Sequence, residues 1–352
     1  HGAAMMGKYI QESELINSSF DCFCINLATA GSLSDIGHIS LKKLLKYFFL
    51  LKHISNVVRE IRPELVYITP NAGRKAFFKD FIVVQMLKSM GCKVIAHYHN
   101  KGVSVYQSKW VYNFFYKRFF SNLKVILLAE NLYKDMAKYV KREDVYICPN
   151  GIPSSCKEEM EARRNNVIPH LLFLSNLLIS KGVIVLLDAL RILKEKGYLF
   201  NCQYVGGETA EINAMQFVVE VERRKLNDRV AYAGRKVGEE KNTFFQQADI
   251  FILPTMNECF PLVILEAMEY KLPVISTNEG GIPDIVKDGE NGLICEKQNP
   301  VSLADCIAKL LDDEELRVKM GSAGHEKFCR EFTLDKFENR MRDILNQNLF
   351  SS

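Results

Sequence analysis

Short apolar runs alternate with longer segments of helical spacing along most of the chain. The runs lie at residues 65–68, 93–96, 125–128, 171–174 and 202–205. A short, continuous apolar run between helical segments is typical of a strand that is buried on both faces of a parallel sheet. The pattern therefore predicts an α/β chain whose parallel sheets are covered by helices on both faces.

A sixth apolar run, residues 250–253, precedes the most informative segment of the chain. Pro254 ends this predicted strand because proline cannot donate to a ladder, and a loop leads to a helix whose first turn suits Pro261. The backbone amides of that first turn have no acceptor within the helix and favour oxygen-rich or anionic ligands. Glu258 lies in the loop and Glu266 in the helix, so two carboxylates could bind the hydroxyl groups of one sugar.

The strands form two series, which predicts two domains in this chain of 352 residues. The turn-forming segment 149–153 separates the series, so we place an N-terminal domain at residues 1–150 and a C-terminal domain at residues 151–332. Residues 154–169 are polar and predict a linker or a surface excursion. Apolar residues at helical spacing predict an amphipathic helix over residues 333–350, which begins at a threonine or aspartate cap and could dock on the first domain.

The N-terminus departs from the usual order of an α/β domain, which opens with a strand. Residues 1–6 instead look like a strand-to-helix loop with no strand before it. This predicts either a chain whose first strand is missing or a sheet whose edge is built differently.

The net charge of +4 is unevenly distributed. Basic residues outnumber acidic ones by ten in residues 1–150, whereas acidic residues are in excess by six in residues 151–352. A basic first domain suggests an anionic partner, such as a phosphorylated acceptor or the inner face of a membrane, although solvated basic helix faces explain the charge equally well. Nucleic acid is disfavoured because the basic residues form no dense cluster.

Aromatic and basic residues are interleaved in residues 110–120. Such a segment could lie at a membrane interface or form a core-packed helix with one basic face, and aromatics on nearly all sides favour the second. No apolar run approaches the roughly 20 residues that span a bilayer. The ten cysteines follow no zinc-binding spacing, which favours reduced thiols in a cytoplasmic protein without a bound metal.

Several short motifs occur in order through the second domain. They are Ser180-Lys181-Gly182, Tyr204-Val205-Gly206-Gly207, Ala233-Gly234-Arg235, Leu253-Pro254, the Glu258 and Glu266 pair, Gly280-Gly281-Ile282-Pro283 and Asn291-Gly292-Leu293. In this order they resemble the retaining glycosyltransferases of family 4, from residue 171 to about residue 311. The resemblance implies the GT-B fold, in which two Rossmann-like domains face each other across a cleft. The N-terminal domain matches more loosely, through the Gly2-Ala3 loop, His97, His99 and Asn150-Gly151.

The resemblance also implies roles for individual residues. Glu266 would accept hydrogen bonds from the ribose hydroxyls of a nucleotide-sugar donor, and Glu258 would hold hydroxyls of the transferred sugar. Lys181 would neutralise the diphosphate as it leaves. The remaining donor contacts would come from Gly234, Arg235, the backbone of Phe260, Pro261, Leu262 and Val263, and the loop at Gly2 and Ala3, with Gly206 as a further candidate.

Asn176 and the two histidines need separate arguments. Asn176 stands where the family usually has arginine, so it could hydrogen-bond a phosphate but brings no charge; either Arg235 compensates or the leaving group is less stabilised. His97 and His99 face the same side at the end of a predicted strand, which suits a site at the carboxyl edge of a sheet. His99 is the preferred catalytic candidate, and a structural role is the alternative for either histidine.

These residues predict transfer of a sugar from a nucleoside-diphosphate donor to a hydroxyl acceptor, with retention at the anomeric carbon and with the nucleotide sugar as co-substrate instead of a cofactor. The absence of an Asp-x-Asp motif favours a metal-independent reaction. The acceptor would be a saccharide or lipid-linked molecule in bacterial surface polysaccharide or glycolipid synthesis. The alternatives are a glycogen-synthase-like or sugar-phosphate-forming transferase and a non-catalytic sugar-nucleotide binding subunit.

Overall fold

The computed structural model describes residues 2–27, 41–154 and 166–350. Contacts group the chain into two compact units. Unit 1 contains His1–Leu127, Tyr133–Cys148 and Glu338–Ser352, and unit 2 contains Leu128–Leu132 and Pro149–Phe337. Most of the linker expected at residues 154–169 lies outside the described residues. Among the helices in the three described ranges, none combines the length and the apolar character that a membrane span needs.

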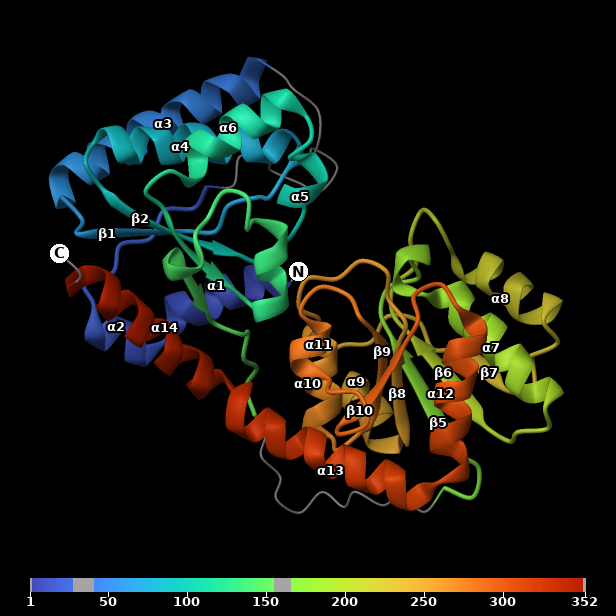
Figure 1. Cartoon of the computed structure of the whole chain (residues 1–352). Helices are drawn as coiled ribbons and strands as arrows, with labels where there is room; N and C mark the ends of the chain where they lie inside the picture. The colour runs from blue at the N-terminus through green and yellow to red at the C-terminus, as the bar shows by residue number, and fades with distance from the viewer. Residues whose placement is uncertain (1, 28–40, 155–165, 351–352) are drawn as a thin grey trace. The chain divides into compact units, whose positions relative to one another are not determined.

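Unit 1 is built on a parallel sheet whose described strands follow one another in chain order (Figure 1). They are β1 (Leu65–Ile68), β2 (Lys93–Tyr98), β3 (Lys124–Leu127) and β4 (Val145–Ile147). The first three confirm apolar runs from which strands were predicted. β2 extends beyond the apolar run 93–96, because His97 and Tyr98 continue to pair with β3.

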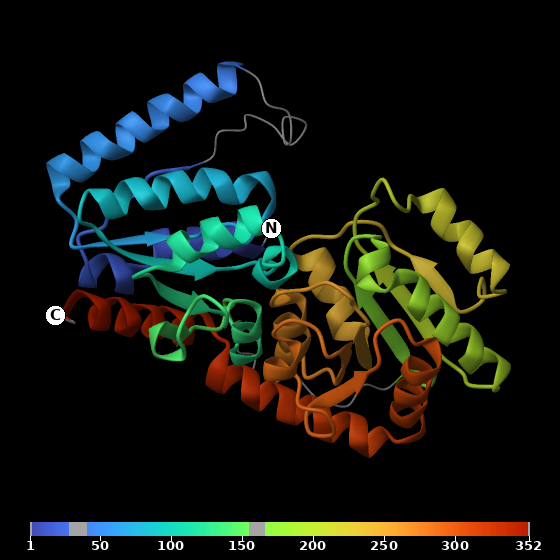
Figure 2. The ribbon, with the colours of Figure 1, turned by 45° about the horizontal axis from the view of Figure 1, so that its top comes forward.

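Helices cover both faces of this sheet, as predicted (Figures 1 and 2). On one face lie α3 (Leu41–Ile61), α4 (Arg74–Ser89) and α6 (Trp110–Phe120), and the short α5 (Val103–Tyr106) follows β2. On the other face lie α1 (Gly2–Glu12), α2 (Glu14–Ser19) and the last helix, α14 (Leu334–Phe350). Aromatic rings such as Phe77 with Phe119 and Phe81 with Phe115 join α4 to α6.

The first described element is a helix and not the loop expected at Gly2 and Ala3. α1 begins at Gly2, so both residues lie in its first turn. Alanine has a high helix propensity, and Met6 on the same helix is completely buried. Local preference and burial therefore both favour the helix.

Unit 2 is built on a second parallel sheet with the strand order β10-β9-β8-β5-β6-β7. Its strands are β5 (His170–Leu174), β6 (Asn201–Val205), β7 (Val230–Tyr232), β8 (Ile250–Leu253), β9 (Val274–Thr277) and β10 (Gly292–Cys295). β5, β6 and β8 confirm the predicted strands. From β5 the chain moves outward through β6 and β7, and then returns to β8 on the other side of β5. The strand order reverses between β5 and β8, and open α/β sheets bind their ligands at such a point.

The helices of unit 2 follow its strands (Figure 1). They are α7 (Val183–Glu195), α8 (Ala214–Arg223), α9 (Glu239–Gln247), α10 (Leu262–Glu269), α11 (Ile282–Ile285), α12 (Pro300–Asp312) and α13 (Glu314–Glu331). Sequence analysis placed Pro261 in the first turn of α10, whereas the structure makes it the residue directly before that turn.

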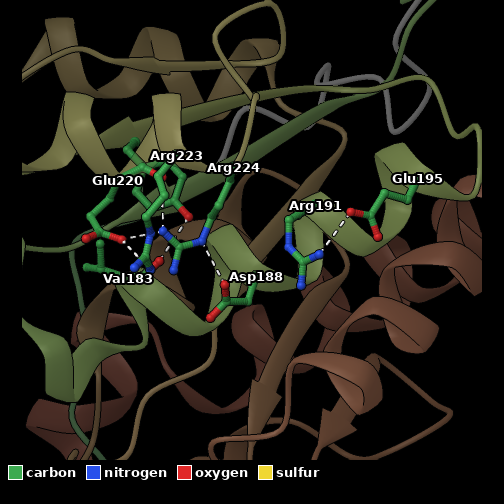
Figure 3. A network of polar contacts seen from close by, with 8 residues as sticks. Val183, Asp188, Arg191, Glu195, Glu220, Arg223 and Arg224 are labelled. Carbon is green, nitrogen blue, oxygen red and sulfur yellow. Dashed lines mark hydrogen bonds and ion pairs between the residues drawn. The ribbon is translucent and has the colours of Figure 1, made fainter.

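The buried Arg224, directly after α8, connects this helix to α7 through ion pairs (Figure 3). The Arg224 side chain is almost inaccessible to solvent. Its Nε donates to Asp188 Oδ1 at 2.7 Å, and it also pairs with the Glu220 carboxylate. Since a buried charge is tolerated only when it is paired, these contacts fix how α8 packs on α7. The Arg191–Glu195 pair lies further along α7 and is exposed.

The C-terminal helix was predicted correctly, but its cap was not. Phe337, Met341 and Ile344 are buried along one side of α14. Thr333 precedes the helix, yet its buried hydroxyl has no hydrogen-bond partner among the described residues. The reason is that the backbone on both sides of Thr333 pairs with Ile152, whose amide donates to Phe332 O and whose carbonyl accepts from the Leu334 amide. This pairing buries the threonine side chain instead of turning it toward the helix.

Candidate functional site

The predicted donor-site residues of unit 2 lie at the carboxyl ends of its strands. Lys181 ends a short 3₁₀ turn after β5, and Glu258 lies in the loop after β8. β5 and β8 are neighbours on either side of the reversal in strand order. The fold thus brings together two residues that are distant in sequence, at the place where a parallel sheet is open to ligands.

Lys181 and Glu258 form an ion pair, with both side chains partly buried. Lys181 Nζ also donates to Asn257 O at 3.3 Å. The neighbouring Gly182 holds this arrangement, because it has φ +84° and a Cβ added there would lie 2.3 Å from Pro254 O. Only glycine permits such a close approach of the two loops. The backbone therefore places Lys181 next to Glu258.

Glu266 forms a second pair, with a lysine that sequence analysis missed. Lys241 Nζ on α9 lies 2.8 Å from Glu266 Oε1 on α10, and both side chains are partly buried. No described residue donates a hydrogen bond to the other carboxylate oxygen of Glu266. No motif marks Lys241 in the sequence, because its role depends on how α9 packs beside α10.

The loop between β8 and α10 is held by a glycine turn. Gly280 has φ +54°, and its hydrogen faces Glu258 O so closely that a Cβ would lie 2.3 Å away. The Gly281 amide donates to Cys259 O at 2.7 Å. Phe260 and Pro261 are buried and directly precede α10, and Leu262 and Val263 begin its first turn, where the amides have no intrahelical acceptor. These contacts fix the conformation of the loop that leads to α10, where the backbone amides of the first turn are free to bind a ligand.

The Asn176 side chain is hydrogen-bonded to the backbone of the loop that follows β6. Its Oδ1 accepts from the Gly207 amide at 3.1 Å. Gly206 must be glycine, because a Cβ there would lie 1.9 Å from Ser175 O. The Gly206 amide in turn donates to Gly234 O at 2.9 Å. Arg235 follows; it is exposed, and the described residues offer it no ion pair. The loops after β5, β6 and β7 thus meet here, with Arg235 available for an anionic ligand.

Of the two candidate histidines in unit 1, His97 lies near the end of β2 and His99 directly follows this strand. Their ring centroids lie 4.1 Å apart, and His97 Nδ1 is 2.8 Å from Tyr67 Oη. His97 Nε2 and both ring nitrogens of His99 are buried without a hydrogen-bond partner among the described residues. Burial lowers the pKa of His99 to about 4 and that of His97 well below its usual 6.5. Both rings are therefore neutral at pH 7.

Asn100, next to this pair, has a structural role. Its Oδ1 accepts from the Ala72 amide at 2.7 Å and its Nδ2 donates to Pro70 O at 3.1 Å. Gly2 and Ala3, the other candidates in unit 1, lie in the first turn of α1.

The similarity to known proteins falls in unit 2, which contains the Lys181–Glu258 and Lys241–Glu266 pairs. Residues 157–327 fit the family model described as glycosyl transferases group 1. This segment belongs to the group 1 glycosyltransferases. This confirms the resemblance noted from the ordered motifs of the sequence.

Two curated relatives show how far the sequence likeness extends. An uncharacterized glycosyltransferase from Methanocaldococcus jannaschii is 32% identical over 176 residues, which is 50% of this chain and 47% of the relative. An amylovoran biosynthesis glycosyltransferase from Erwinia amylovora is 24% identical over 297 residues, or 78% of this chain and 72% of the relative. The chain spans less than half the length of the first relative.

Solved structures agree with the fold. A sucrose-phosphate synthase from Thermosynechococcus elongatus has a TM-score of 0.68 at 21% identity, covering 90% of this chain and 81% of that one. HepE from Anabaena, solved in complex with UDP, has a TM-score of 0.69 at 18% identity, covering 85% and 82%. Together with the two parallel sheets, these likenesses confirm the predicted GT-B class of α/β fold.

Proposed function

We propose that this chain is a retaining, metal-independent glycosyltransferase that moves a sugar from a nucleoside-diphosphate sugar to a hydroxyl acceptor. The observation that carries the proposal is the pair of carboxylate–lysine contacts, Lys181 with Glu258 and Lys241 with Glu266, beside the start of α10. A polyhydroxylated and anionic ligand needs acceptors for its hydroxyl groups and positive charge for its phosphates. This part of unit 2 offers both.

Each residue then has a chemical task. Glu266, held through one oxygen by Lys241, accepts from the ribose hydroxyls with the other. Glu258 accepts from hydroxyls of the transferred sugar. The bond between the anomeric carbon and the leaving phosphate oxygen breaks, and Lys181 and the amides of the first turn of α10 stabilise the charge on the nucleoside diphosphate.

Retention follows if the acceptor approaches on the face that the diphosphate leaves. The acceptor oxygen bonds to the anomeric carbon, and its proton passes to the departing phosphate oxygen. A double displacement would instead need a carboxylate nucleophile, for which Glu258 is the candidate. Its pairing with Lys181 favours a binding role, so no covalent sugar adduct should form on it.

The acceptor class rests on relatives named for amylovoran and capsular polysaccharide biosynthesis and for glycosyl transfer to D-inositol 3-phosphate. A saccharide hydroxyl in surface polysaccharide synthesis fits the two polysaccharide names, and a lipid-linked hydroxyl in glycolipid synthesis is the alternative acceptor.

Thermal unfolding with UDP, GDP, ADP and their sugars, with and without EDTA, tests the donor site. We expect one nucleotide to raise the midpoint at saturating concentration, in EDTA as in buffer, because a ligand that binds only the folded state stabilises it. Glu266→Ala should abolish the shift. If no nucleotide raises the midpoint, the proposal is wrong. If a nucleotide binds but its sugar is neither transferred nor slowly hydrolysed, the chain is a binding subunit.

Lys241→Met is expected to weaken donor affinity about tenfold while changing kcat little, since it frees Glu266 to turn away from the ribose. Calorimetric titration with the identified nucleotide would measure this. Lys236→Met is the matched control, because Lys236 on the same segment pairs with the exposed Glu240 at 3.4 Å. Equal affinity in the Lys241 variant and the control would refute a positioning role for Lys241.

A further inference from the structure

Three neighbouring helices of unit 1 form one layer on the sheet. Figures 1 and 2 show α4 between α3 and α6 on the same face. The inner side of this layer is packed: Ile54 and Val58 of α3, Phe77 of α4 and Phe119 of α6 are buried. Tyr47 Oη on α3 also donates to Lys79 O on α4 at 2.6 Å. The layer is thus a fixed part of unit 1.

The outer side of the same layer exposes large apolar side chains. On α3, Leu45, Phe48 and Phe49 share a face at i, i+3 and i+4 and are 51%, 61% and 62% exposed. On α6, Trp110 and Phe114 are one turn apart and 80% and 49% exposed. The sequence favoured a packed core over a membrane interface for α6; in the structure one side of the helix is buried and the other side is exposed.

The charge of the layer is strongly positive. α3, α4 and α6 contain five, four and two Lys or Arg residues, but only one, one and no Asp or Glu residues. Exposed basic residues lie beside the apolar ones on all three helices, and six of them have no ion pair with any described residue: Lys46, Lys52, Arg59, Lys75, Lys117 and Arg118. The Arg118 guanidinium instead lies 5.0 Å from the centre of the Phe114 ring.

We propose that the outer face of α3, α4 and α6 docks on an anionic lipid bilayer. Aromatic side chains prefer the boundary between headgroups and acyl chains, while lysine and arginine reach back to lipid phosphates from the same helix face. An acidic protein partner would satisfy the charges, but side chains that project singly from helices are better suited to insertion between lipids. The proposal concerns where the protein acts and is independent of the reaction proposed above.

The chain supplies its own probe, because Trp110 is its single tryptophan. The emission of Trp110 in the full chain is measured as vesicles of phosphatidylcholine, with or without phosphatidylglycerol, are added. We expect a blue shift with the anionic vesicles alone, which weakens as salt is raised because the charges are screened. The double variant Phe48→Ser with Phe49→Ser should lower vesicle affinity about tenfold for each aromatic removed. Vesicle co-sedimentation then tests Trp110→Ser.

Met215→Ser with Val219→Ser is the matched control, since both residues are exposed apolar positions on α8 of unit 2. This variant should bind vesicles as the unchanged chain does. The proposal is overturned if the Trp110 emission is unmoved by anionic vesicles, or if binding survives in the α3 and α6 variants. It is also overturned if these variants abolish self-association in light scattering without altering lipid binding, because the face would then belong to a second copy of the chain.

Discussion

Replacing Lys181 with methionine is expected to lower kcat for sugar transfer about 10²–10³-fold, the usual cost of losing one preorganised group that stabilises charge in a transition state. The charge of the diphosphate grows only as the sugar departs, so donor affinity should change much less than kcat. The measurement is steady-state transfer with the donor identified by thermal shift. The midpoint of unfolding should be recorded as well, since the change leaves Glu258 without its partner.

Lys194→Met controls for the loss of a paired lysine in the same unit. Lys194 bonds Asp228 and Lys225 O at the far end of α7, away from the carboxyl ends of the strands. It should leave kcat unchanged. If kcat of the Lys181 variant is within threefold of the control, then Lys181 has only a structural role. Another positive charge would then have to stabilise the leaving group, and Arg235 is the first candidate.

The architecture was predictable because its signals are local. Every apolar run from which a strand was predicted coincides largely with a strand in the structure, because short apolar runs that alternate with helical segments pack into a sheet covered on both faces. Lys181 and Glu258 are distant in sequence, and only the ordered motifs linked them. Their pairing in the structure reflects the adjacency of β5 and β8, which periodicity alone does not give.

What could not be predicted depends on contacts between distant segments. Lys241 reaches Glu266 because of how two helices pack. Thr333 fails to cap α14 because Ile152 pairs with the backbone around it. Asn176 Oδ1 accepts from the Gly207 amide, a contact that the sequence did not indicate, and Asn176 Nδ2 is the group that could donate to a phosphate. In each case, the residue type allowed several partners and tertiary structure selected one.

The last prediction concerns the histidine pair of unit 1. The pKa of His99 is lowered by burial from 6.5 to about 4, so the unfolded chain binds a proton more readily than the folded one. The stability that depends on neutral His99 is present above pH 6.5 and is lost as pH falls toward about 4. At about 1.4 kcal/mol per pKa unit, the free energy of unfolding should drop by about 3 kcal/mol over this interval. His97 adds a loss of the same sign, because its pKa is also lowered.

Denaturant unfolding between pH 7 and pH 4 measures this slope, and His99→Gln should flatten it because glutamine does not titrate. Carboxylates titrate in the same range in every variant, so the difference between variants is the informative quantity. His53→Gln is the control, since His53 is an exposed histidine on α3 of the same unit. If the two variants give the same slope, then His99 is protonated in the folded state near pH 6.5. Water or a ligand would then have to reach its ring nitrogens, which the structure shows as buried and without partners.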